Sequence, residues 1–172
     1  MNELEKDYQE KTKMKNIEQI IFGSFEINTW YFSPYPEEYG NQKLLYICEN
    51  CLKYMKKKKS IMKHQTKCTF KHPPGEVIYV DSTPSILPIQ EIPKSIVIYE
   101  VDAANNKLYC QCLCLFAKLF LDHKTMYFDI SSFIFYILTE EYKGKCNFVG
   151  YFSKVILLRI RICLMITIYL VL

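Results

Sequence analysis

Glycine is scarce in this 172-residue sequence, which contains only five glycines and none in a pattern typical of a phosphate-binding loop. Such loops favour glycine because backbone N–H groups must approach the phosphate closely. The polar N-terminus also lacks the apolar core of a secretory signal. We therefore expect a reducing, intracellular setting, in which the eight cysteines bind metal or fill the core rather than form disulfides.

Aromatic residues are plentiful, with fourteen tyrosines and eleven phenylalanines, and half of all residues are hydrophobic. Aromatic side chains suit half-buried strands, so this composition indicates a folded, strand-rich chain rather than a disordered one. The length allows one ordinary domain with a buried core and a small additional module. The net charge of +4 is modest, so the distribution of charge carries more information than its sum.

One stretch has the spacing of a metal site. Cys48 and Cys51 are separated by two residues, twelve residues follow, and His64 and Cys68 are separated by three. Three thiolates and one imidazole at these spacings predict a tetrahedral zinc site. Four protein ligands leave no open position, so we expect a structural rather than a catalytic metal. We also expect His64 and Cys68 to lie on one face of a short helix. The alternative is a chance pair of core cysteines beside a surface histidine.

Acidic residues are nearly absent around this motif, while lysine is abundant. Between residues 43 and 71, Glu49 is the single acid against nine lysines, at positions 43, 53, 56, 57, 58, 59, 63, 67 and 71. Such a cluster can neutralise nucleic-acid phosphates, and Lys56, Lys57, Lys58 and Lys59 are the predicted contacts. The alternative is a solvated face that keeps the module soluble. No motif for reading a specific DNA sequence accompanies the lysines.

Strand-like segments interrupted by few helix-like segments predict an α+β protein with a mostly antiparallel sheet. We expect strands over residues 20–22, 24–27 and 76–80, a hairpin at Asn105-Asn106, a buried helix over 113–121, and further strands broken at residues 131–132 and 143–144. The predicted organisation is a polar lead-in (1–15), N-terminal strands (16–42), a zinc finger (43–72), a core region (73–154) and an atypical apolar tail (155–172).

Five separated segments together resemble one family. They read TWYFSPYPEEY (29–39), LYICENCLKYM (45–55), KHPPGEVIY (71–79), LFAKLFLDHKTMYFDI (115–130) and VGYFSK (149–154). In this order they are similar to the N-terminal half of the catalytic domain of MYST-type histone acetyltransferases. Two departures stand out, because Cys112 replaces the family's usual asparagine and Val80 its usual arginine.

The resemblance implies a zinc finger followed by the first half of a GNAT-like acetyltransferase core. It implies transfer of an acetyl group from acetyl-CoA to histone lysines, in the nucleus, on histones and nucleosomes and within chromatin complexes that regulate transcription. The family's zinc ligands correspond to Cys48, Cys51, His64 and Cys68, and the lysine that members acetylate on themselves corresponds to Lys124.

The family's catalytic glutamate, active-site cysteine and coenzyme loop follow the segment that ends here at Lys154, and we assign no catalytic residue in this sequence. We therefore expect a truncated chain that is inactive on its own. The alternative is a non-catalytic, zinc-dependent protein that binds chromatin or nucleic acid, including non-specific contact with DNA.

Other reactive residues have simpler explanations. The alternating cysteines Cys110, Cys112 and Cys114 could suggest a second metal site or a nucleophile, but the resemblance places Cys110 and Cys114 in the core. His123 is expected to be a structural loop histidine. The paired acids Glu140 and Glu141 are expected in a solvated turn.

The tail, residues 155–172, contains no Gly, Pro, Asp, Glu, Asn or Lys. Its length approaches that of a membrane span, but Arg159 and Arg161 would each cost roughly 2.5 to 3.5 kcal/mol near the centre of a bilayer. A membrane anchor is therefore disfavoured. We expect either a departure of the reading frame from the family sequence at Lys154, or a tail that packs on the sheet as a strand or helix.

Overall fold

A computed structural model describes residues 14–81, 95–124, 129–156 and 163–164, and they form two compact units. Unit 1 comprises the described parts of Met1–Cys48, Leu52–Lys67 and Gln111–Met126. Unit 2 comprises the described parts of Glu49–Cys51, Cys68–Cys110 and Tyr127–Leu172. The helix α4 (Lys107–Lys118) therefore contributes residues to both units.

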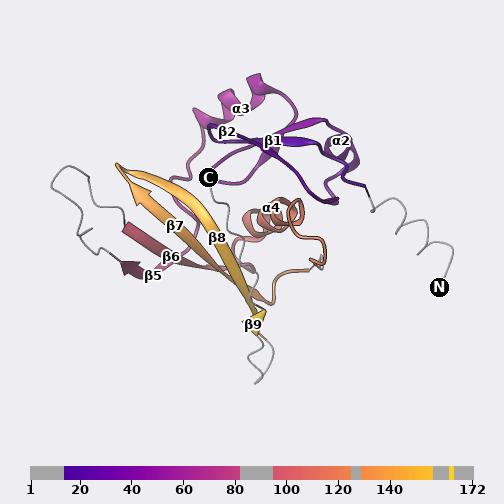
Figure 1. The fold of residues 1–172 in the computed structure, drawn as a ribbon. Coiled ribbons are helices and arrows are strands. Elements are labelled where there is room, and N and C mark those ends of the chain that lie inside the picture. Colours follow the sequence, from indigo (N-terminus) through magenta and orange to yellow (C-terminus); the bar gives the residue numbers. More distant parts are fainter. Residues whose placement is uncertain (1–13, 82–94, 125–128, 157–162, 165–172) are drawn as a thin grey trace, which may run out of the picture. The chain divides into compact units, whose positions relative to one another are not determined.

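Unit 1 is built on a four-stranded sheet in the order β2-β1-β3-β4. Figure 1 labels two of these strands, β1 and β2. The strands are β1 (Gln19–Phe22), β2 (Phe25–Asn28), β3 (Leu44–Ile47) and β4 (Tyr54–Met55). β1 runs antiparallel to β2 and parallel to β3. Alternate residues of β1 and β3 are buried, and the parallel register places Ile20 beside Leu45 and Phe22 beside Ile47. The strands at residues 20–22 and 24–27 were thus predicted correctly to within about one residue.

The core of unit 1 is completed by the C-terminal part of α4. Phe116 is fully buried, and its ring stacks on Phe22 with 5.0 Å between centroids. The segment after β2 is tied to the same helix, because the Ser33 hydroxyl donates to the Leu115 carbonyl at 2.7 Å. The backbone N–H groups of Trp30 and Tyr31 both donate to the carbonyl of Leu119. A short helix, α2 (Glu37–Gly40), follows Pro36, whose fixed φ is compatible with the residue before a helix.

Unit 2 is a five-stranded antiparallel sheet in the order β5-β6-β7-β8-β9 (Figure 1). The strands are β5 (Glu76–Asp81), β6 (Ser95–Asp102), β7 (Phe133–Tyr142), β8 (Lys145–Val155) and β9 (Cys163–Leu164). One face is buried in rows that cross the sheet, such as Tyr99, Ile137 and Tyr151. Buried residues alternate with partly exposed ones along β6 and β7, with the period of two that is typical of antiparallel sheets.

Two predicted turns are corrected by the structure. Asn105-Asn106 does not join two strands, since the Asp102 carboxylate accepts hydrogen bonds from Ala104 N and Asn105 Nδ2 and the chain then enters α4. The run after Asn106 reads as a strand locally, but its buried residues, Tyr109, Cys110, Leu113, Cys114 and Phe116, recur at helical spacing. Glu140 and Glu141 lie within β7 rather than in a turn, and Glu141 accepts a hydrogen bond from the Tyr99 hydroxyl at 2.8 Å.

The tail enters the structure at one point. β9 pairs with β8 through Ser153 opposite Leu164 and Lys154 opposite Cys163. This pairing agrees with the expectation that the tail packs on the sheet as a strand. The rest of the tail, residues 157–162 and 165–172, lies outside the described part of the chain. Residues 125–128, which belong to the strand region predicted after Lys124, also lie outside it. No helix among the described residues is long and apolar enough to cross a membrane.

Gly75 permits β5 to approach β6. A Cβ atom at this position would overlap the carbonyl oxygen of Glu100 and lie 2.9 Å from Val101 Cγ2. The obstacle is backbone, so it cannot rotate away, and we expect Gly75→Ala to lower the free energy of unfolding by about 1 to 3 kcal/mol. Urea denaturation measures this loss. Gly144→Ala is the comparison for backbone strain without overlap, because a Cβ at Gly144 meets nothing within 4 Å while an alanine would be strained at its φ of +74°. Equal losses for the two variants would contradict the predicted overlap.

Candidate metal centre

The four residues predicted from spacing come together. The ligand atoms of Cys48, Cys51, His64 and Cys68 all lie within 4.8 Å of one another. Three thiols and one imidazole are ligands that suit zinc, and four of them complete a tetrahedral shell without water or substrate. Donor type, number and proximity therefore fit a structural zinc ion.

A tight turn presents the first two ligands. β3 ends at Ile47 and Cys48 follows it, with its N–H donating to the Lys53 carbonyl at 3.0 Å. The Leu52 N–H donates back to the Cys48 carbonyl at 2.9 Å. Leu52 adopts a positive φ of 61° although it is not glycine, and its side chain is almost fully buried. Burial of Leu52 thus holds the backbone in a turn conformation that a leucine seldom adopts.

The second pair of ligands comes from α3 (Lys58–Gln65) and the residues after it. His64 lies three residues after Ile61, the buried residue of this helix, so both are on the inner face. Cys68 is not on the helix, which corrects the prediction of a shared helical face. The helix ends at Gln65, and a turn closed by the Lys67 N–H donating to the His64 carbonyl at 2.9 Å carries the chain to Cys68.

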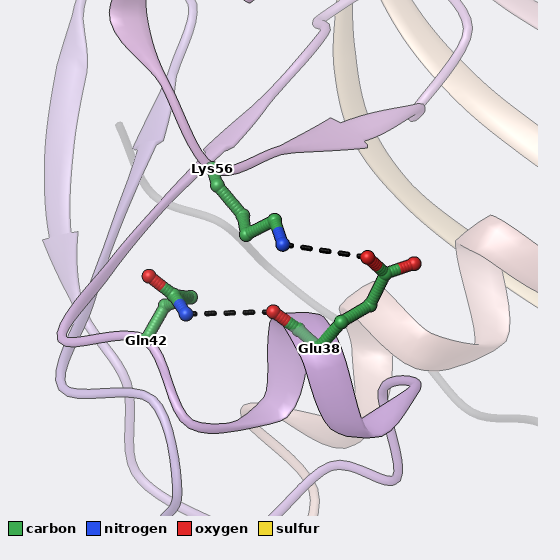
Figure 2. A network of polar contacts seen from close by, with 3 residues as sticks. All are labelled: Glu38, Gln42 and Lys56. Carbon is green, nitrogen blue, oxygen red and sulfur yellow. Dashed lines mark hydrogen bonds and ion pairs between the residues drawn. The ribbon is translucent and has the colours of Figure 1, made fainter.

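The lysine cluster is not uniform. Lys57, Lys58 and Lys59 are exposed at the start of α3. Lys56, in contrast, forms an ion pair with Glu38 at 3.4 Å (Figure 2). Its Nζ also lies 5.0 Å from the centre of the Tyr39 ring. The backbone carbonyl of Glu38 also accepts from Gln42 Nε2 at 3.4 Å. Lys56 is thus engaged within the protein, whereas its three successors face solvent.

Lys124 follows α4 and is half-buried. It donates a hydrogen bond to the thiol of Cys114, and this contact lowers the pKa of that thiol against the larger opposing effect of burial. The neighbouring His123 side chain is 99% exposed, with Nε2 3.7 Å from an Asp122 carboxylate oxygen. The loop position agrees with the prediction, whereas so exposed a side chain does not fit the structural role that we expected for it.

The cysteines of α4 are packed residues rather than a second metal site. Cys110 and Cys114 are buried, as predicted, and Cys112 is half-buried. Among the residues that the structure describes, the one group of metal-ligating side chains found is the set around Cys48.

The thiol of Cys112 gives a pH dependence. Burial raises its pKa to about 11, an effect that Lys53 partly offsets. As pH rises from about 8.5 towards 11, the unfolded chain loses this proton while the folded chain keeps it, so the free energy of unfolding falls. We expect Cys112→Ala to flatten this decline in urea titrations between pH 8 and pH 10. Burial also raises the pKa values of Tyr35 and Tyr54, so part of the decline remains in the variant. Identical slopes would show that Cys112 does not contribute.

Comparisons with known proteins extend these observations to most of the chain. The family described as "MYST family zinc finger domain" matches residues 14–68, and the "MOZ/SAS family" matches residues 72–166, more than half of the chain. This chain belongs to the MYST (MOZ/SAS) family. The second match extends twelve residues beyond Lys154 and includes β9.

Named histone acetyltransferases are similar to this chain over most of its length. It is 49% identical over 149 residues to "Histone acetyltransferase of the MYST family 1" of Arabidopsis thaliana, and the match covers 87% of this chain and 31% of the relative. It is 50% identical over 151 residues to "Histone acetyltransferase MOF" of Drosophila melanogaster, covering 88% of this chain and 17% of the relative. The chain thus spans a third or less of the length of these relatives.

Proposed function

We propose that this chain forms the zinc finger and the first part of the acetyltransferase core of a MYST-type histone acetyltransferase. The two family matches support the proposal, because they follow one another in order over 14–68 and 72–166 and the relatives are named histone acetyltransferases. The reaction is transfer of an acetyl group from acetyl-CoA to a histone lysine. Histones within nucleosomes, chromatin complexes and the nucleus are the corresponding substrates, partners and location.

The metal centre has a supporting role in this proposal. Its four protein ligands leave no coordination position for a reactant, so the zinc would hold the turn after β3 against α3. A substrate lysine has a reference pKa of ~10.4 and must lose a proton before it attacks a thioester, which a positioned base accomplishes. We assign that base to no residue of this chain.

The proposed organisation remains N-terminal strands (16–42), zinc finger (43–72) and partial core (73–154).

The test is acetyl transfer from radiolabelled acetyl-CoA to core histones. The protein is purified from its native cells through a tag at the chromosomal gene, so that whatever the gene encodes is assayed. We expect labelled histones, and a loss of at least tenfold in the Cys48→Ala variant. Absence of label with the native protein would contradict the proposal. The purified 172-residue chain is expected to show negligible turnover, because none of its five glycines lies in a phosphate-loop pattern.

Lys124 is proposed as a site of self-acetylation. Its half-buried position and its hydrogen bond to Cys114 support a role for its charge: burial raises the pKa of the Cys114 thiol, Lys124 partly offsets that rise, and acetylation would remove the offset. Peptide mass spectrometry of the native protein should find acetyl-Lys124. Lys59 is the internal control, because its side chain is exposed and non-specific chemical acetylation would modify it at least as readily as the half-buried Lys124. Equal acetylation of both lysines would indicate non-specific modification.

A second candidate function is non-catalytic, zinc-dependent binding to DNA. The observation that favours it is the exposed run Lys57, Lys58 and Lys59 beside the metal centre. Fluorescence anisotropy with a duplex of arbitrary sequence tests it. Replacing these three lysines with glutamine should weaken binding and make the salt dependence shallower, by roughly 0.9 in slope for each phosphate that is no longer neutralised. Lys56→Gln is the matched control and should have little effect, because Glu38 already engages Lys56. No binding at moderate salt would exclude this function.

A further inference from the structure

A thiol and an amine are in contact beside the second half of α4. Cys114 lies in this helix and is only 7% exposed. Lys124 lies in the segment after the helix, and its side chain donates a hydrogen bond to the Cys114 thiol. Both residues belong to unit 1, so the contact lies within one compact unit. Neither residue is part of the metal-ligating group. The pair is therefore a second place where thiol chemistry has a specific partner.

The turn that follows α4 sets the position of Lys124. The helix ends at Lys118, whose Nζ donates to the carbonyls of Leu121 and Asp122 at 3.1 Å and 2.9 Å. Leu119, the first residue after the helix, is fully buried. These contacts all precede Lys124 in the chain, so they fix the turn from its N-terminal side. The amine is thereby held at the helix that carries Cys114.

A thiol in contact with an amine can be linked to it through one oxygen atom. Hydrogen peroxide oxidises the thiol to a sulfenic acid and releases one water molecule. A second peroxide then takes one hydrogen from the sulfenic S–O–H group and one from the amine, the N–O bond forms, and two water molecules leave. In total, one thiol, one amine and two molecules of hydrogen peroxide give one N–O–S bridge and three molecules of water.

Proximity and burial act on different steps of this reaction. A group held in contact with its reaction partner has an effective concentration of about 10⁵ M or more, which favours capture of the sulfenic acid by the amine over further oxidation. Burial slows the first step, because it raises the pKa of the Cys114 thiol and so lowers the fraction of reactive thiolate. Lys124 partly offsets that rise. We therefore expect the bridge to form slowly but selectively.

We propose that Cys114 Sγ and Lys124 Nζ form a covalent N–O–S bridge when the protein meets hydrogen peroxide. The bridge cross-links α4 to the segment after it. A dithiol reverses it, because two dithiol molecules are oxidised to disulfides while the thiol, the amine and one water molecule are released. A bridged Lys124 has no primary amine, so bridging and acetylation of this lysine exclude each other. The proposal rests on the contact between the two side chains and does not depend on acetyltransferase activity.

The test is peptide mass spectrometry of the zinc-loaded full chain after exposure to millimolar hydrogen peroxide. Trypsin does not cut after a bridged Lys124, so we expect the peptide of residues 108–118 joined to that of residues 119–143. The joined peptide is about 14 Da heavier than the sum of the two, because one oxygen is gained and two hydrogens are lost. Residues 119–143 contain no cysteine, so a disulfide cannot produce this link. A dithiol should separate the two peptides.

Three variants assign the link to this pair. Cys114→Ser nearly keeps the shape of the side chain without its sulfur, and Lys124→Arg keeps the charge without a primary amine, so each should abolish the joined peptide. Cys112→Ser is the matched control, because Cys112 lies in the same helix and the same tryptic peptide, and it should leave the link unchanged. Persistence of the link in Cys114→Ser would contradict the assignment. In the unsubstituted chain, oxidised Cys114 with no link to Lys124, or no oxidation of Cys114 at all, would overturn the proposal.

Discussion

Replacing Cys48 with alanine is expected to abolish zinc binding and to unfold the region around the metal centre. Cys48 is fully buried, and its Sγ is one of four ligand atoms within 4.8 Å of one another. Metal binding at such sites contributes on the order of 10 kcal/mol to folding, which exceeds what a short helix and a two-residue strand can supply. We expect β4 and α3 to lose their structure first, because β4 has only two residues and α3 has a single buried residue, Ile61.

The measurement combines metal release with circular dichroism. A chromogenic chelator should extract one zinc per chain from the wild type, with a simultaneous loss of helical signal, and none from Cys48→Ala. Cys146→Ala is the matched control, because Cys146 is a half-buried thiol in β8 outside the metal group. Retention of one bound zinc in Cys48→Ala, with an unchanged spectrum, would contradict the assignment of this ligand.

Replacing Phe116 with alanine should cause the largest loss of stability among substitutions away from the metal. Phe116 is fully buried, stacks on Phe22, and meets Phe120 edge to face at 5.8 Å between ring centroids. Truncation of a buried phenylalanine removes apolar burial and leaves a cavity, which together cost about 3 to 5 kcal/mol. Most small domains have a total stability of only about 5 to 15 kcal/mol, so this change would bring unit 1 close to unfolding.

Urea denaturation of the zinc-loaded protein measures this effect. Leu108→Ala is the control in the same helix, because Leu108 is 79% exposed and should lose well under 1 kcal/mol. Comparison of the two variants separates core packing from helix propensity, since each removes a large side chain from α4. Similar unfolding midpoints for both variants would show that Phe116 does not anchor the helix in unit 1.

Local sequence patterns predicted a feature correctly where one short stretch of the chain contains all the residues that form it. The ligand set Cys48, Cys51, His64 and Cys68 lies within twenty-one residues, and its spacing alone predicted the group that the structure brings together. The strands at residues 20–22 and 76–80 were also predictable, because β-branched and aromatic residues bounded by turn signals indicate strands.

Prediction failed where a local pattern suits two structures. The residues after Asn106 can form a strand or a helix, and burial of Leu113 and Phe116 in the core of unit 1 decides for α4. Glu141 looked like a turn residue, yet the Tyr99 hydroxyl, forty-two residues earlier, holds it within the sheet. In both cases the deciding partner is distant in sequence, and a local window does not contain it.

The amino-acid sequence by itself determined the metal ligands, the α+β class and the family, because ligand chemistry, side-chain period and order of motifs are properties of the chain. The tertiary structure decided which lysines face solvent, since only folding brings Glu38 to Lys56 across eighteen residues. It also decided that, in the part of the chain that the structure describes, β5 is an end strand of its sheet. Strand pairing is a contact between distant segments, and which strand ends the sheet depends on the order β5-β6-β7-β8-β9 rather than on any residue of β5.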